Sequence, residues 1–246
     1  MEPVYRQKIT VGANHVDRFQ RVKPSVLLYF IQDAAGKHCV VYGADWDSLA
    51  KKNMVWAVTR HRVQISRLPR EGETITVETW PMPTTRVAYP RSVVAYDEAG
   101  QEVFRAISLW VLMDTESRAM VLPGKSGVTV DGQLTGTELA VPRSMVPMVL
   151  ENSICRTVRY TELDINGHMN NTRYMDWVDD LLPSAFHGAH PVREFTICYH
   201  AEAREGQQIT LAHQLLEGPC LRVDAHREKT VVGGGEERVF SAQILF

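Results

Sequence analysis

The sequence predicts an α+β protein made of two tandem copies of one unit, each with a central helix and antiparallel strands. Three observations predict this class. Three short segments recur in the same order, each copy has apolar residues at helical spacing after a polar loop, and runs of β-branched and aromatic residues follow. We expect a first unit over residues 1–130, a linker over 131–150 and a second unit over 151–246.

The repeat lies in three pairs of segments whose spacings along the chain are similar. The offsets, from Asp17 to Asp164, Arg70 to Arg204 and Val103 to Val239, are 147, 134 and 136 residues. The paired segments are 16–25 with 163–172, 70–77 with 204–211, and 103–106 with 239–242. Because order and spacing agree, we interpret the pairs as two copies of one unit.

In each copy, a helix is predicted directly after the polar loop. The first begins near Pro24, where a missing N–H costs no helical hydrogen bond, and Gly36 marks a bend or an end. The second is capped by Asn171 or Thr172 and ends before Pro183. The apolar positions of the two helices are Val26, Leu27, Phe30, Ile31 and Ala34, and Tyr174, Trp177, Val178 and Leu181.

Strands are predicted before each loop and after each helix. In the first copy they cover residues 5–11, 56–66, 73–82, 86–96 and 102–113, and in the second copy 154–160, 194–201, 208–216, 221–230 and 237–246. The glycine run 233–235 is interpreted as a hairpin turn and not as a phosphate loop, because no Gly-Lys-Ser/Thr follows it.

The composition is that of a soluble globular protein, with 44% hydrophobic and 23% charged residues. The net charge of −2 favours neither nucleic-acid binding nor attraction to anionic lipid, and no apolar run is long enough for a membrane span. The start of the chain lacks the apolar region of a signal peptide, so we expect a cytoplasmic protein. Its cysteines, which show no C-x-x-C spacing, are expected to be reduced thiols in or near the core: Cys39, Cys155, Cys198 and Cys220.

The loop of the second copy carries the groups that favour catalysis. Asp164, Asn166 and His168 place a carboxylate, an amide and an imidazole at alternate positions. Asn166 can donate to an oxygen that develops negative charge, and His168 can exchange a proton near neutral pH. The helix start at Asn171 and Thr172 adds backbone N–H groups that suit an oxyanion.

The first copy keeps only part of this set. It has Asp17, Phe19 and Arg21 where the second copy has the carboxylate, the amide and the imidazole. We therefore expect the chemistry in the second unit alone.

The string Asp164 to Trp177, Asp-x-Asn-x-His-x-Asn-Asn-x-x-Tyr-x-x-Trp, resembles the motif of the acyl-acyl carrier protein (acyl-ACP) thioesterases. Segments 14–19 and 56–60 resemble first-unit features of the same family, and the resemblance covers essentially the whole chain. It implies a tandem double hotdog fold, in which each antiparallel sheet wraps a central helix. It also implies hydrolysis of fatty acyl-ACP, with release of free fatty acid and an end to chain elongation. The implied partner is an acyl carrier protein, the implied acyl-chain pocket lies in the first unit, and the assembly would be a monomer or a homodimer.

The resemblance also implies a fourth catalytic residue, Glu202. The family has a Glu in a Tyr-x-x-Glu-Cys string, which matches Tyr199 to Ala203 here. Because Ala203 stands where plant members have Cys, a cysteine nucleophile is disfavoured.

Two assignments of the general base stay open. In one, Glu202 activates a water, Asn166 and the helix-start N–H groups hold the thioester carbonyl, His168 orients the water and Asp164 positions the loop. In the other, His168 is the base and Asp164 holds it.

Other functions fit the sequence less well. An acyl-CoA thioesterase would use the same residues. Enoyl-thioester hydratases of this fold have Asp-x-Asn-Pro-x-His, whereas Gly167 takes the proline position here and His168 falls one place early. A non-catalytic acyl-thioester binder is opposed by the intact set of four residues. We expect no metal and no cofactor, because the histidines lack ligand spacing, and no Gly-x-Ser-x-Gly elbow is present.

Overall fold

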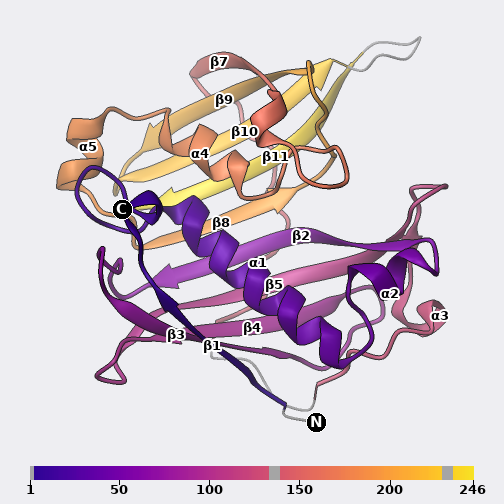
Figure 1. Cartoon of the computed structure of the whole chain (residues 1–246). Helices are drawn as coiled ribbons and strands as arrows, with labels where there is room; N and C mark the ends of the chain where they lie inside the picture. Colours follow the sequence, from indigo (N-terminus) through magenta and orange to yellow (C-terminus); the bar gives the residue numbers. More distant parts are fainter. Residues whose placement is uncertain (1–2, 133–138, 229–234) are drawn as a thin grey trace. The chain divides into compact units, whose positions relative to one another are not determined.

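The computed structural model describes residues 3–132, 139–228 and 235–246. The chain divides into two compact units, Met1–Pro142 and Arg143–Phe246. Each unit combines helices with an antiparallel sheet (Figure 1). The predicted α+β class is therefore confirmed.

The N-terminal unit is a sheet with one long helix packed across it. The strands run in the order β1-β3-β4-β5-β2, all antiparallel, and the short β6 pairs with β5. Figure 1 shows α1 lying across this sheet. Its elements are β1 (Tyr5–Thr10), η1 (Ala13–His15), α1 (Pro24–Val41), α2 (Trp46–Ala50), β2 (Met54–Ile65), β3 (Thr74–Pro81), β4 (Tyr89–Tyr96), β5 (Glu102–Asp114), β6 (Met120–Val121) and α3 (Pro123–Ser126).

Helix α1 begins as the sequence predicts but does not end where it predicts. Pro24 occupies the first turn, and Leu27, Leu28 and Ile31 are completely buried against the sheet. Of the two expectations at Gly36, a bend or an end, the end is wrong, because the helix continues to Val41. Glycine costs a helix only about 1 kcal/mol, and burial of His38 and Cys39 beyond it offsets that cost.

The C-terminal unit repeats this plan on a smaller scale. Its strands run in the order β8-β11-β10-β9-β7, so β7, β9, β10, β11 and β8 correspond to β1, β3, β4, β5 and β2. The predicted repeat is therefore confirmed at the level of topology. Its elements are β7 (Asn152–Thr157), η2 (Tyr160–Glu162), α4 (Arg173–Asp179), α5 (Ser184–Ala189), β8 (Glu194–Tyr199), β9 (Gln208–Leu216), β10 (Cys220–Glu228) and β11 (Glu236–Leu245).

Helix α4 packs one aromatic face into the core of its unit. The ring of Tyr174 lies 4.9 Å from that of Phe240 and 5.6 Å from that of Tyr199. Met175 and Val178 are completely buried. The short helix is thus held mainly by packing against β8 and β11, since seven residues are too few for an independently stable helix.

Helix α4 begins where the sequence predicts, but it ends earlier than the predicted apolar run. Thr172 is the N-cap residue, although its own side chain makes no capping bond, and the side chain of Asn170 supports the turn before the helix. Its Oδ1 accepts bonds from the N–H of Thr172 (3.0 Å) and from the Thr172 hydroxyl (2.9 Å). The helix ends at Asp179, and Pro183 instead precedes the short helix α5. Proline tolerates the start of a helix because it has no N–H to leave unbonded there.

The cysteines are free thiols, but one of them lies outside the expected environment. Cys39 and Cys198 are buried and Cys220 is partly buried, whereas Cys155 is exposed on the edge strand β7. The expectation of a core position is therefore wrong for Cys155. Of the predicted glycine turn, Gly233 and Gly234 lie outside the described residues, as does the predicted strand end at Thr230.

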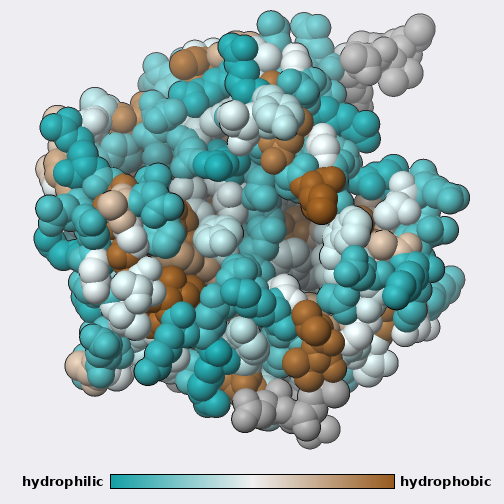
Figure 2. All heavy atoms as spheres, viewed as in Figure 1, coloured by the Kyte–Doolittle hydropathy of each residue, from teal (hydrophilic) through white to brown (hydrophobic). Residues whose placement is uncertain are grey.

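The visible face of the molecule is mostly hydrophilic, with hydrophobic residues in separate small patches (Figure 2). Within the described ranges, no helix has both the length and the apolar character that crossing a membrane requires.

Candidate active site

The loop that carries Asp164 and His168 is organised by the Asp164 side chain. Its Oδ1 accepts the backbone N–H of Asn166 at 2.8 Å and that of His168 at 3.4 Å. The backbone closes the same turn, because the N–H of Asp164 donates to the carbonyl of His168 at 2.8 Å. Gly167 has a φ of 73°, a left-handed conformation that glycine adopts without strain. Asp164 therefore positions the loop through its backbone.

The first unit contains the same loop with different side chains. Asp17 Oδ1 accepts the N–H groups of Phe19 (2.7 Å) and Arg21 (3.0 Å), and the N–H of Asp17 donates to the Arg21 carbonyl. Gln20, at the position of Gly167, also has a positive φ, of 61°. Arg21 replaces His168 and forms an ion pair with Asp17. The loop conformation thus belongs to the repeated unit, and only the second copy adds an imidazole.

The structure brings His168 and Glu202 together from two separate segments. His168 Nε2 lies 3.2 Å from Glu202 Oε2, and the two side chains are 13% and 41% exposed. The segments are joined where the N–H of Met169 donates to the carbonyl of Ala203 at 2.8 Å. A half-exposed carboxylate beside an imidazole can exchange protons with a water or a substrate.

The first unit shows what this arrangement looks like without the carboxylate. The corresponding backbone bond runs from Val22 to the carbonyl of Pro69 at 2.9 Å, so Leu68 takes the position of Glu202. With Arg21 and Leu68 in place of His168 and Glu202, the first unit has no equivalent acid–base pair.

The other predicted site residues are Asn166, Asn171 and Thr172, and the backbone N–H groups of two of them are already hydrogen-bonded. Asn166 is exposed, and its N–H is used by Asp164. The N–H of Thr172 is used by Asn170, so it is not available for an oxyanion. The buried Oδ1 of Asn171 has no hydrogen-bond partner among the residues that the structure describes. The oxyanion role of Asn171 and Thr172 stays a prediction.

Two positioning residues of the site were missed by sequence reasoning. Glu162 accepts the indole N–H of Trp177 at 2.5 Å and the N–H of Arg159 at 2.7 Å, and its carbonyl accepts the N–H of Asn170. It therefore ties the loop to α4. Arg227 on β10 donates to the carbonyl of Glu202 at 2.6 Å. The indole of Trp177, which needs an acceptor when buried, was the one local signal for Glu162.

A buried tyrosine supports the other side of the loop. Tyr199 donates its hydroxyl to the carbonyl of Asn171 at 2.9 Å. Burial raises the pKa of Tyr199 well above its usual value, so the hydroxyl stays protonated and keeps donating.

No cysteine occupies the position next to Glu202. Ala203 is there, and it is completely buried. Among the described residues, no group of three or more His, Cys, Asp or Glu side chains is arranged to hold a metal ion.

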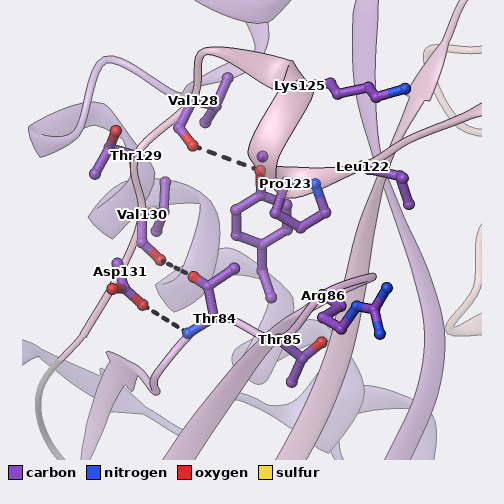
Figure 3. Close-up of a pocket in the computed structure, with 12 residues that line it drawn as sticks. Thr84, Thr85, Arg86, Leu122, Pro123, Lys125, Val128, Thr129, Val130 and Asp131 are labelled. Carbon is purple, nitrogen blue, oxygen red and sulfur yellow. Dashed lines mark hydrogen bonds between the residues drawn. The ribbon is translucent and has the colours of Figure 1, made fainter.

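An open pocket of about 680 Å³ lies in the N-terminal unit (Figure 3). Its apolar lining includes Tyr89, Pro123 and Val128, and the side chains of Arg86 and Lys125 extend away from Val128. None of the predicted site residues lines it. The lining of this pocket therefore includes neither His168 nor Glu202.

Comparisons with known proteins agree along the chain. Residues 2–122 match the model of the acyl-ACP thioesterase N-terminal domain, and residues 151–236 match that of the C-terminal domain. The chain is 25% identical over 214 residues to the chloroplastic palmitoyl-acyl carrier protein thioesterase of Gossypium hirsutum, which covers 81% of this chain and 52% of that protein. It is 26% identical over 217 residues to the chloroplastic dodecanoyl-[acyl-carrier-protein] hydrolase of Cinnamomum camphora, covering 81% and 56%. The chain thus spans about half the length of the curated relatives it matches.

Solved structures match over the whole chain. An acyl-ACP thioesterase from Bacteroides thetaiotaomicron has a TM-score of 0.89 at 22% identity, covering 99% of this chain and 98% of that one. The 12:0-ACP thioesterase from Umbellularia californica has a TM-score of 0.82 at 21% identity, covering 100% and 97%. These likenesses confirm the predicted hotdog fold. With both family models matched in order along one chain, the chain belongs to the acyl-ACP thioesterase family.

Proposed function

We propose that this chain hydrolyses the thioester of fatty acyl-ACP, releasing a free fatty acid and ending chain elongation. The main support is the contact between His168 Nε2 and Glu202 Oε2 at 3.2 Å, next to a loop that Asp164 organises. Family membership supports the same reaction class. We also propose that the acyl carrier protein is the partner, that the N-terminal unit holds the acyl chain and that the protein is cytoplasmic.

The proposed chemistry is attack of water on the thioester carbonyl. Glu202 takes a proton from a water, and the resulting hydroxide bonds to the carbonyl carbon, leaving negative charge on its oxygen. As the carbonyl re-forms, the C–S bond breaks, and the leaving thiolate takes up the proton held by Glu202, which returns Glu202 to its carboxylate form. His168 orients the carboxylate and the water, and Asp164 fixes the backbone of His168.

His168 is the alternative base. The described contacts favour Glu202, because Asp164 directs its Oδ1 to backbone N–H groups. A pH profile separates the two, since removal of the base also removes its ionisation from the acid side of the profile.

The test is a hydrolysis assay that follows thiol release from acyl-ACP and acyl-CoA substrates of graded chain length. Relatives carry palmitoyl, dodecanoyl and oleoyl in their names, so the panel should cover 12 to 18 carbons. Glu202→Gln should lower turnover by ~10²-fold or more. Glu205→Gln, at an exposed carboxylate of the same loop, is the matched control and should stay near wild type.

The results also separate the other functions. A hydratase would change the absorbance of an enoyl thioester without releasing thiol, and a binding protein would do neither. Faster release from acyl-CoA than from acyl-ACP would reassign the carrier. Normal hydrolysis by Glu202→Gln would remove this residue from the base role.

A further inference from the structure

The backbone of the segment that carries Glu202 accepts a hydrogen bond from an arginine, Arg227. Arg227 Nη1 donates to the carbonyl of Glu202 and to Oε1 of Gln207, both at 2.6 Å. The other side of the guanidinium binds Glu237 Oε2, through Nε at 2.8 Å and Nη2 at 2.5 Å. The Arg227 side chain is only 18% exposed. Because Glu237 engages two of its nitrogens, the guanidinium is oriented before it meets the Glu202 carbonyl.

The first unit has the same loop closure. Glu73 Oε1 accepts the N–H of Arg70 at 3.1 Å, just as Gln207 Oε1 accepts the N–H of Arg204 at 2.9 Å. A cation binds the closing side chain in both units. In the first unit this cation is Arg67, whose Nη1 lies 2.7 Å from Glu73 Oε2.

The source of the cation differs between the units. Arg67 lies in the loop itself and reaches across to Asp97, at 2.8 Å, just beyond the end of β4. In the second unit the corresponding loop residue is Ala201, and the cation, Arg227, lies on β10 at the position equivalent to Asp97. The equivalence follows from strand register, because both pairs of strands shift register directly after Ala95 and Ala225.

The residue at this strand position, Asp97 or Arg227, decides whether it can donate a hydrogen bond to the backbone carbonyl at the position of Glu202. An aspartate at position 97 cannot donate to the carbonyl of residue 68, which is Leu68. An arginine at position 227 donates to the carbonyl of Glu202. The donor is therefore found in the unit that has a carboxylate to position, and not in the unit that lacks one.

We propose that Arg227 is a positioning residue of the reaction. It fixes the backbone at Glu202, so that the carboxylate stays in contact with His168. This inference rests on the proposed function for its effect on turnover, but not for its effect on the His168–Glu202 contact.

The kinetic test compares Arg227→Gln with Arg67→Gln. The second variant removes the matching cation of the first unit and is the control for a purely structural effect. Arg227→Gln should lower kcat about 10-fold or more with little change in KM, because a small displacement of a reacting group costs this much. The acid limb of its pH profile should also move. Arg67→Gln should change neither kcat nor the profile.

A second readout needs no activity. NMR titration of the His168 ring reports whether the Glu202 carboxylate is near, because a carboxylate at 3.2 Å favours the protonated imidazole. The pH at the midpoint of the His168 titration should fall in Glu202→Gln, move in the same direction in Arg227→Gln, and stay unchanged in Arg67→Gln. Glu237→Gln, which weakens only the orientation of Arg227, should give a smaller shift and serves if Arg227→Gln folds poorly.

The outcomes are separable. If Arg227→Gln has the kcat and the His168 midpoint of the wild type, or if Arg67→Gln reproduces its effects, the inference is overturned. If the wild type hydrolyses no thioester while the His168 midpoint moves as expected, the proposed function fails and the positioning role stands.

Discussion

Replacing Asp164 with Ala should remove two hydrogen bonds that hold the backbone of the catalytic loop. The substitution removes the acceptor of the Asn166 N–H at 2.8 Å and of the His168 N–H at 3.4 Å. His168 then loses the bond to its N–H, although its carbonyl still accepts the backbone N–H of residue 164. We expect kcat to fall by ~10- to 100-fold, because the imidazole no longer has one fixed position.

The magnitude of the stability effect follows from the same contacts. A hydrogen bond to a charged group contributes about 1.5–3 kcal/mol, and less where water can replace it. One of the two bonds is long, and the loop is partly exposed. We therefore expect a loss of about 1–2 kcal/mol, and each 1 kcal/mol lowers the Tm of a chain of this size by roughly 2–4 °C.

Asp17→Ala is the matched control. It removes the same pair of N–H bonds, at 2.7 and 3.0 Å, together with the ion pair to Arg21. Its loss of Tm should equal or exceed that of Asp164→Ala, whereas kcat should stay near wild type. The assay is thiol release alongside thermal unfolding. Equal losses of kcat in the two variants, or full activity of Asp164→Ala, would refute the reasoning.

Three further predictions concern stability. Burial lowers the pKa of His61, which lies 2.7 Å from Ser108, to about 3. Below pH 6.5 the unfolded chain therefore binds a proton that the folded chain does not, and the free energy of unfolding should fall toward pH 3 by up to ~1.4 kcal/mol per pH unit; His61→Asn should flatten this slope in urea titrations at pH 7 and 5. Trp177→Phe removes the N–H donor to Glu162 and should cost about 1–2 kcal/mol, measured by denaturant unfolding. Gly36→Ala adds a Cβ with no atom within 4 Å on an exposed helix position, and should raise the urea midpoint through a gain of about 0.5–1 kcal/mol.

Much of the fold could be predicted because its signals are local. The start of α1 follows from Pro24 and the helical spacing after it, and strand ranges such as Gln208–Leu216 follow from period and composition. The ends of helices could not be predicted equally well. Gly36 is a weak stop signal, and Pro183 marks a helix boundary without showing that α4 already ends at Asp179 or that α5 follows; both outcomes depend on packing.

The candidate site, too, could be predicted from local sequence only in part. The positions of Asp164 and His168 in one tight loop follow from the sequence, because the five residues from Asp164 to His168 include a glycine and can form such a turn, and the repeat supplies a second example. Glu202 entered only through the family resemblance, since nothing in its local sequence distinguishes it from Glu205.

The sequence by itself determined the α+β class, the repeat and the loop that carries the imidazole. Only the tertiary structure decided that Glu202 lies beside His168 and that Arg227 holds the Glu202 carbonyl. Both contacts join segments that are distant in sequence, and the position of Arg227 depends on the register of β10, where a shift of one residue would turn its side chain to the other face of the sheet. Local periodicity predicts which residues form a strand, but the register between strands is set by the packing of the whole unit.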